Sequence, residues 1–210
     1  GTETMKFFQY YSNCHLNKVL KTSAHPSISL VVFLLATIFI LPSLTFAEVS
    51  KEYYPSGKLE AERNYINGKL EGISDVYYEN GKLKFERNYI NGKREGISKG
   101  YYESGILKFE RNYINGKREG ISKGYSESGQ LLLEENFKND KRKGISKMYY
   151  KSGQLWMEMN YKNGKREGIS KGYYESGEYR YKDTYKDGNK INRKAYTARG
   201  KLKFNQDYPQ

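Results

Sequence analysis

Cysteine and histidine are almost absent from this chain, and the few present lie near its N-terminus. The single cysteine is Cys14, and the two histidines are His15 and His25. From residue 48 onward the chain therefore cannot form a disulfide, a zinc site built on Cys or His, or a Cys–His or Ser–His catalytic pair. We accordingly expect no catalytic residues, no metal site and no cofactor, and a protein that is not an enzyme.

Charged residues are absent from residues 28–47, an apolar segment that includes ISLVVFLLATIFIL. It ends in Thr45-Phe46-Ala47, a small-x-small pattern typical of a signal peptidase site. A stretch of about 20 apolar residues can also span a bilayer. We interpret residues 1–47 as a signal peptide or an uncleaved membrane anchor that starts at Met5, with a buried core helix as the less favoured alternative.

Lys18 and Lys21 precede the apolar segment and favour an N-terminus held inside. The rest of the chain is then expected to be exported across a bacterial inner membrane, as a periplasmic, cell-surface, secreted or anchored protein. We expect residues 48–52 to be a short linker and residues 53–208 to be a repeat array. With a net charge of +13, anionic partners are favoured, and export makes nucleic acid the least expected of them.

Glycines recur along the chain with a fixed period of 24 residues, which becomes 23 at the last step. The first series is Gly57, Gly81, Gly105, Gly129, Gly153, Gly177 and Gly200. A second series begins at Gly68 and a third at Gly72, and both follow the same period. A period of this length is typical of a repeat protein, in which each unit is one small element stacked on its neighbours.

One unit, residues 81–104, has the pattern of a β-hairpin. Side chains alternate from Leu83 to Ile90, as in a strand. Asn91-Gly92 then favours a two-residue turn, and residues 96–102 are expected to return as a second strand. Because no segment is left for a helix, the fold class is predicted to be all-β. We expect an elongated single-sheet antiparallel meander of about six hairpins and a terminal half repeat, after the apolar N-terminal helix.

Equivalent positions in successive units form columns. An aromatic residue follows each first-series glycine by eight residues and is expected to stack between strands. Gly100 and Gly124 stand inside strands, where they are expected to leave room for a neighbouring ring. A glutamate column is interpreted as a cross-strand charge ladder rather than a set of catalytic acids. Its members are Glu62, Glu86, Glu110, Glu134 and Glu158.

The pattern YYxSGxLxxExxYxNGKxxG resembles the bacterial variant of the MORN repeat. It stands here as residues 101–105, then Leu107, Glu110, Tyr113, residues 115–117 and Gly120. The resemblance covers residues 53 to about 208. It implies an elongated antiparallel sheet of hairpins, protein–protein scaffolding or contact with membrane lipid, and no catalytic motif. Many bacterial relatives are described as toxin–antitoxin components, a role that export would oppose.

The hairpin tips are the first candidate binding surface, since they carry a basic pair once per unit. The pairs are Lys93, Arg94, Lys117, Arg118, Lys141, Arg142, Lys165 and Arg166. Spaced cations suit a polyanionic surface through many weak contacts. The alternative is a solubilising edge without a ligand, because Glu95, Glu119 and Glu167 dilute the charge.

An aromatic face is the second candidate, since a single-layer sheet cannot bury both faces. Its residues are Tyr101, Tyr125, Tyr149, Trp156 and Tyr173. They could bind a sugar ring or a partner helix or strand, or simply pack across strands. Overall we expect an exported, non-enzymatic scaffold that binds a protein or an anionic envelope component such as a lipid headgroup or acidic polysaccharide. A polysaccharide-binding module and an antitoxin-like immunity partner are the alternatives.

Overall fold

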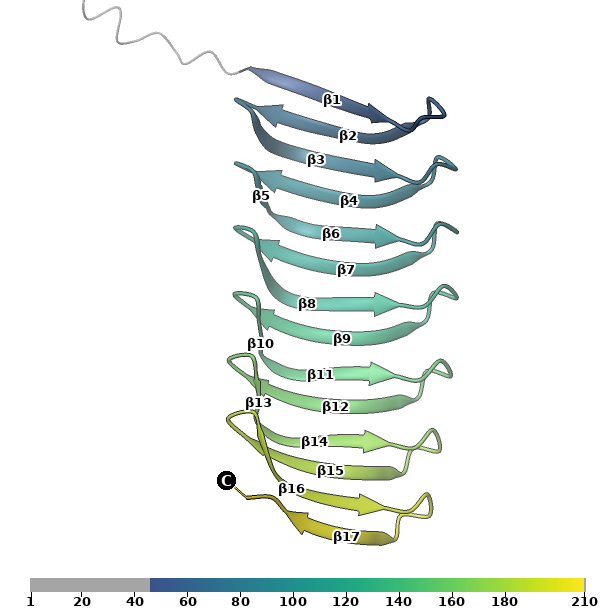
Figure 1. The fold of residues 1–210 in the computed structure, drawn as a ribbon, viewed down its shortest axis with the longest axis vertical. Coiled ribbons are helices and arrows are strands. Elements are labelled where there is room, and N and C mark those ends of the chain that lie inside the picture. Colours follow the sequence, from purple (N-terminus) through teal and green to yellow (C-terminus); the bar gives the residue numbers. More distant parts are fainter. Residues whose placement is uncertain (1–45, 210) are drawn as a thin grey trace, which may run out of the picture. The chain divides into compact units, whose positions relative to one another are not determined.

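Residues 46–209 are described by the computed structural model, and they form one antiparallel sheet of 17 strands (Figure 1). The strands pair as a meander. The two-residue strands β5, β10 and β13 pair with the same partner as the strand that follows each of them. The strands are β1 (Ala47–Tyr53), β2 (Leu59–Ile66), β3 (Lys69–Tyr77), β4 (Leu83–Ile90), β5 (Lys93–Arg94), β6 (Gly96–Tyr101), β7 (Leu107–Ile114), β8 (Lys117–Tyr125), β9 (Leu131–Lys138), β10 (Lys141–Arg142), β11 (Gly144–Tyr149), β12 (Leu155–Lys162), β13 (Lys165–Arg166), β14 (Gly168–Tyr173), β15 (Tyr179–Lys186), β16 (Asn189–Tyr196) and β17 (Leu202–Asp207).

The predicted all-β meander of hairpin repeats is confirmed for this part of the chain. None of the residues that the structure describes belongs to a helix long and apolar enough to cross a membrane. The predicted signal or anchor segment, residues 1–47, lies almost wholly outside the described residues.

The turns follow the glycine series. Asn91 and Gly92 both have positive φ, 50° and 76°, as a type I′ hairpin turn requires. Gly105, at the opposite edge of the sheet, has a φ of 93° and closes its turn with a 2.8 Å bond to the Tyr102 carbonyl. Each unit therefore contributes a tip at one edge and a Ser-Gly turn, or an equivalent, at the other (Figure 1). The tip is Asn-Gly in four units and Asn139-Asp140 or Asp187-Gly188 in the other two.

The linker expected at residues 48–52 is a strand instead. These residues lie within β1, which pairs along its length with β2. The reason is visible in the register, where Lys51 lies opposite Glu62 and continues the charge ladder by one strand. β1 is thus the half repeat that pairs the edge of the first hairpin, as β17 does for the last.

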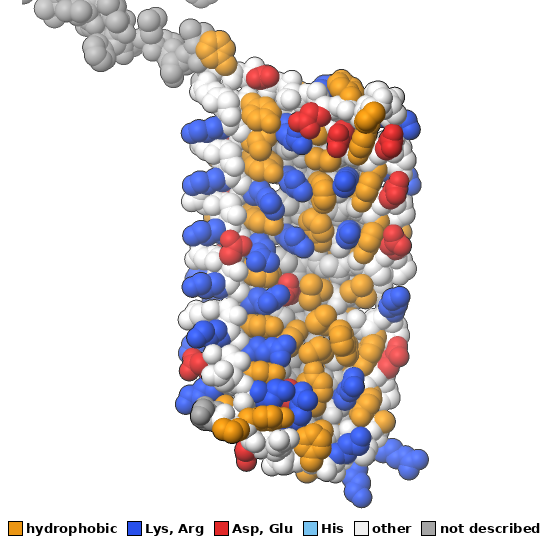
Figure 2. Space-filling view, viewed as in Figure 1, with side chains coloured by type: hydrophobic (Ala, Val, Ile, Leu, Met, Phe, Trp, Pro, Cys, Tyr) orange, Lys and Arg blue, Asp and Glu red, His pale blue; other side chains and the backbone are white. Residues whose placement is uncertain are grey.

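The two faces of the sheet carry different side chains because successive residues of a strand point to opposite sides. The arginine face of one unit holds Ser98, Gly100, Phe109, Arg111 and Tyr113. The ladder face holds Ile97, Lys99, Tyr101 and Glu110. Figure 2 shows stripes of basic and hydrophobic side chains running down the stacked strands.

The buried centre of the arginine face is the predicted aromatic column. Tyr113, Phe137 and Tyr185 are only 6%, 3% and 8% exposed. Each ring is covered by an arginine of the preceding hairpin. Arg94 lies 4.8 Å from the Tyr113 ring centroid, and Arg118 lies 4.0 Å from that of Phe137. In place of a second layer, the long side chains of one hairpin shield the rings of the next.

Tyrosine hydroxyl groups form a second contact between consecutive hairpins, which we term the tyrosine bridge. The Tyr102 hydroxyl donates to the Tyr125 carbonyl at 2.7 Å. Equivalent bonds are made by Tyr54, Tyr78, Tyr150 and Tyr174. Ser126 replaces the tyrosine in one unit, and an open cleft of about 410 Å³ lined by Tyr102, Ser126 and Leu132 lies there.

Gly100 and Gly124, the two mid-strand glycines singled out in the sequence, differ in what they accommodate. A Cβ added to Gly100 would lie 2.4 Å from Cε1 of Phe109, so the predicted ring contact is confirmed there. At Gly124 the neighbour is Leu133, whose Cβ would be 3.5 Å away, so the ring expected at that position is absent. The pairing register explains this, because Gly100 faces Phe109 whereas Gly124 faces Leu133.

Replacing Ser126 with Tyr is expected to stabilise the protein. The new hydroxyl would donate to the Tyr149 carbonyl and the ring would fill the cleft, which raises the free energy of unfolding by about 1 kcal/mol. Urea denaturation measures this, with Tyr102→Phe as the matched variant that removes an existing bridge. An unchanged or lower stability of Ser126→Tyr would contradict the role of the bridge.

Gly100→Ala is expected to lower the free energy of unfolding by roughly 1–3 kcal/mol, since the methyl group would collide with the Phe109 ring. Gly124→Ala is the control, because the same methyl group meets only an ordinary contact there. It should be neutral or slightly stabilising. Equal losses for the two variants in denaturant titrations would show that the ring contact is not the cause.

Candidate anion-binding surface

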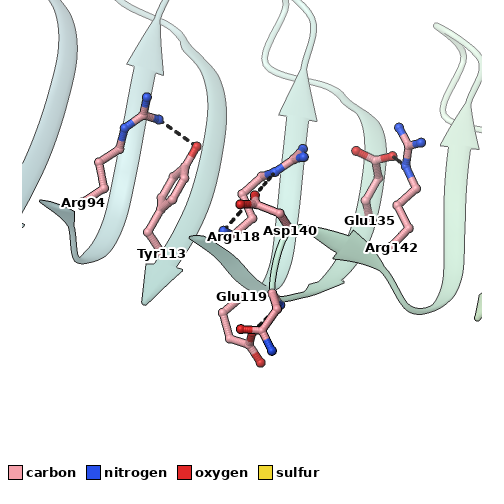
Figure 3. Close-up of polar contacts among 8 residues, drawn as sticks. Arg94, Tyr113, Arg118, Glu119, Glu135, Asp140 and Arg142 are labelled. Carbon is pink, nitrogen blue, oxygen red and sulfur yellow. Dashed lines mark hydrogen bonds and ion pairs between the residues drawn. The ribbon is translucent and has the colours of Figure 1, made fainter. Parts of the chain in front are cut away.

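The basic pairs at the hairpin tips separate into two roles. Lys93, like the other tip lysines, is exposed, and its Cβ lies 3.7 Å from the position that a Gly116 Cβ would occupy. Its stem therefore rests on the next turn while its ammonium group stays in water. The side chain of Arg94 instead extends over the face of the sheet to the next hairpin, where it donates to the Tyr113 hydroxyl at 2.8 Å (Figure 3).

The predicted tip residues thus form an outer row and an inner row. Lys93, Lys117, Lys141 and Lys165 are the exposed outer row. Arg94, Arg118, Arg142 and Arg166 are the inner row, and each lies over an aromatic ring of the next hairpin. Arg118 also binds Asp140, and Arg142 binds Glu135 at 2.5 Å (Figure 3). The outer lysines are therefore the ones available to a ligand.

The tip glutamates connect consecutive tips, an arrangement that we term the glutamate clamp. The Glu95 carboxylate accepts a bond from the backbone amide of Asn115 at 2.7 Å. The same bond joins each of the pairs Glu71–Asn91, Glu119–Asn139 and Glu167–Asp187. The sequence indicates only that these side chains dilute the basic charge, whereas in the structure each accepts a bond from the next tip.

One unit departs from this arrangement. Lys143 occupies the position of the clamp glutamate, so within residues 46–209 the Asn163 amide has no such carboxylate partner. An open cleft of about 550 Å³ lies at this place. It is lined by Lys138, Asn139, Lys141, Lys143, Lys162 and Asn163. We call it the lysine cleft. Four ammonium groups and a turn without its carboxylate make it suited to an anion.

Sequence reasoning named only Lys141 among these lining lysines. The signal that identifies the cleft was nevertheless present, because Lys143 breaks a column that reads glutamate at positions 71, 95, 119 and 167. The sequence alone does not show what that glutamate does. Its role follows from the structure, in which the carboxylate accepts a hydrogen bond from the next tip.

The charge of the arginine face changes along the array. Arg87 and Arg111 stack on Phe85 and Phe109 at 4.3 and 4.2 Å. At the equivalent position later units carry Glu135, Met159 and Asp183, each of which accepts a bond from a basic side chain. The units that carry Glu135 and Asp183 are therefore neutralised internally on this face, and in the Met159 unit the column carries no charge.

Asp183 is the most buried of these groups, with 2% exposure, and it sits under two basic side chains. Arg193 donates to it twice, at 2.6 and 2.7 Å, and Lys190 lies 3.2 Å away. Burial alone would raise the pKa of the Asp183 carboxyl, but the bonds from Arg193 and Lys190 outweigh burial and lower it.

The predicted aromatic face is only partly assembled. Tyr101, Tyr125 and Tyr173 lie on the ladder face, where their carbonyls accept the tyrosine bridges. Tyr149 holds the equivalent position in the unit without a bridge. Trp156 packs against Tyr150 instead, with ring centroids 6.0 Å apart. These rings are half-buried in cross-strand contacts.

Comparison with protein families identifies the repeat. A family described as MORN repeat variant matches residues 49–67, 70–91, 94–115, 118–139, 142–163 and 166–187. The chain belongs to the MORN repeat variant family. No curated protein matches the chain. Each matched MORN segment ends at the tip of a hairpin, and the segments that end at residues 91, 115, 139 and 187 contain the tip residue whose amide binds the glutamate clamp. Within residues 46–209, no cluster of three or more acidic, histidine or cysteine side chains is placed to hold a metal ion.

Asp183→Asn is expected to destabilise the array at neutral pH by about 2 kcal/mol, because it weakens hydrogen bonds between charged groups. Since the folded-state pKa of Asp183 lies below the unfolded value of about 3.9, its contribution is present above that pH and is lost as the pH falls through the folded value. Denaturation at pH 7 and in strong acid tests this. A stability difference that is the same at both pH values would contradict the ion pair.

Proposed function

We propose that this MORN array is an exported, non-enzymatic scaffold that binds an anionic envelope surface through its hairpin tips. The observation that carries the proposal is the lysine cleft, in which a lysine replaces the glutamate clamp of the other units. The apolar segment at residues 28–47 supports a location at the membrane.

The chemistry of the cleft favours an oxyanion. In the other units a carboxylate accepts from the amide of the next tip, which shows that this amide is placed to bind an oxygen atom carrying negative charge. An external phosphate or carboxylate group in the cleft would take the same position beside Asn163. The lysines that line the cleft would balance its charge.

The row of tip lysines extends this site into a surface. Hairpin tips are two strand spacings apart, so the lysines recur about every 10 Å along one edge. Each contact between a lysine and a headgroup is weak. Because the rigid sheet presents the lysines together, binding at one raises the effective concentration of headgroups at the next, and the overall affinity increases. A membrane leaflet rich in anionic lipid offers charges at a matching density.

Other partners remain outcomes of the same test. An acidic protein would also bind the cleft, and a polysaccharide could stack on the Trp156–Tyr150 pair. An antitoxin-like role, as an immunity partner, would require a specific protein instead. Binding to lipid alone, in the absence of other proteins, separates the membrane proposal from these alternatives.

The test is co-sedimentation of residues 48–210 with vesicles that contain phosphatidylglycerol or only phosphatidylcholine. Binding is expected only to the anionic vesicles and should collapse between about 0.05 and about 0.3 M salt, since the exposed charges are then screened. Lys143→Glu should abolish most of this binding while it stabilises the fold by restoring the glutamate clamp.

Lys151→Glu is the matched control. It makes the same change of charge, and it also restores a residue found in other units, because positions 79, 103, 127 and 175 are glutamate. Lys151 lies at the opposite edge of the sheet, so its substitution should leave vesicle binding largely intact. Equal losses of vesicle binding for Lys143→Glu and Lys151→Glu would show that only the net charge matters and would contradict a binding site at the lysine cleft.

A further inference from the structure

The charge ladder is a continuous column across the whole sheet. Its members are paired strand by strand in the order Lys51, Glu62, Asp75, Glu86, Lys99, Glu110, Lys123, Glu134, Lys147, Glu158, Lys171, Lys182, Lys194 and Asn205. Opposite charges lie side by side through the middle of the array. Glu158 and Lys171, for example, are 2.8 Å apart.

Two residues reverse the charge expected from the alternation, and the terminal Asn205 is neutral. Asp75 occupies a position that is lysine at 99, 123, 147 and 171, and Lys182 occupies one that is glutamate at 62, 86, 110, 134 and 158. Each creates three like charges on adjacent strands, acidic around Asp75 and basic around Lys182. Burial raises the pKa of Asp75, and the neighbouring carboxylates Glu86 and Glu62 raise it further. Within one chain each adds repulsion between like charges on adjacent strands, while the Lys182 ammonium also lies 3.7 Å from the Tyr179 ring centroid.

The two exceptions lie at matching distances from the two ends of the column. Asp75 is third from the start of the column, and Lys182 is third from its end. If the column is turned end over end and laid on itself, Asp75 meets Lys182. The outermost pair then joins Lys51 to the neutral Asn205, and the charges of the other six pairs are opposite. The pairs are Glu62–Lys194, Asp75–Lys182, Glu86–Lys171, Lys99–Glu158, Glu110–Lys147 and Lys123–Glu134.

We propose that the ladder face binds a second copy of this chain, antiparallel, about a two-fold axis that runs along the strands between β8 and β9. Such an axis leaves each column opposite itself with its order reversed, as an isologous interface requires. Each unlike pair occurs twice, so the Asp75 of each copy faces the Lys182 of the other. The unfavourable charges of the single chain become favourable contacts in the dimer.

The charges also select this register over its neighbours. A shift by one strand brings Glu86 opposite Glu158 and Lys99 opposite Lys147. Parallel stacking of two copies would bring every charge opposite its own kind. Like charges that face one another across an interface oppose association, so the pattern disfavours these alternatives.

An apolar column beside the ladder supplies the remaining contact. Its isoleucines have about half of their surface exposed, for example 51% at Ile97 and 55% at Ile121. The members are Ile73, Ile97, Ile121, Ile145 and Ile169. A row of large exposed apolar side chains is typical of an interaction surface, and two sheets can pack face to face with their strands nearly aligned.

This inference is independent of the proposed lipid binding, because it uses the ladder face and leaves the hairpin tips unoccupied. The experiment measures self-association of the full chain in detergent micelles by sedimentation equilibrium, with Asp75→Lys and Lys182→Glu compared to the unaltered protein. Each variant restores the alternating ladder. Asp75→Lys should stabilise the monomer, whereas Lys182→Glu also removes the contact of Lys182 with the Tyr179 ring. Each should nevertheless raise the dissociation constant of the dimer by about tenfold, because two facing pairs become like-charged.

Combining the two substitutions gives a result that loss of folding could not produce. A mixture of Asp75→Lys and Lys182→Glu should form heterodimers, in which unlike charges face one another again. The double variant should dimerise like the unaltered protein. The proposal would be overturned if both single variants had the same dissociation constant as the unaltered protein. It would also be overturned if the mixture of the two variants associated no more tightly than either variant alone.

A zero-length carboxylate–amine cross-linker locates the contact. Glu86 and Lys171 lie seven strand spacings apart in one chain, about 34 Å, so only two copies can bring them together. Mixing copies labelled with ¹⁴N and ¹⁵N should yield the Glu86–Lys171 link as a mixed species. Dimers that lack this link would place the interface elsewhere and contradict the ladder.

Discussion

Each hairpin of this protein is held to the next by side chains that reach forward by one repeat. A single-layer sheet has no second layer against which to bury its residues, so these contacts replace a conventional core. An arginine covers the next aromatic ring, a tyrosine hydroxyl binds the next turn, and a glutamate binds the next tip. Together with the strand pairing, they make stability a sum of contacts between neighbouring hairpins.

Departures from the repeat then become the informative positions. Ser126 and Lys143 each remove one forward contact, and both lie beside open clefts. Asp75 and Lys182 each place like charges on adjacent strands. At each of these four positions the other units carry the residue that fits the repeat. Comparison with those units therefore shows what each departure changes in the fold. The tips and the ladder face use such departures for two different proposed partners, an anionic surface and a second copy.

Much of the fold follows from the sequence because its determinants are local. Asn-Gly pairs specify the turns, and alternation specifies which residues share a face. The sequence favours a linker at residues 48–52 because these residues lack the Asn-Gly tip and the glycine that precede the equivalent strands of the other units. The division of the tip cations could not be predicted either. Lys93 and Arg94 are neighbours with the same charge, and only the position of Tyr113 on the next hairpin shows that the arginine is engaged.

Native-state hydrogen exchange tests most directly whether the forward contacts hold the array together. The amides of β9 to β12, which follow Ser126 and flank Lys143, should exchange faster than those of β4 to β8, although both segments are internal and share the same strand pairing. Such a difference would show that local stability follows the side-chain contacts between hairpins. Equal protection of the two segments would contradict the account, because backbone pairing alone would then suffice.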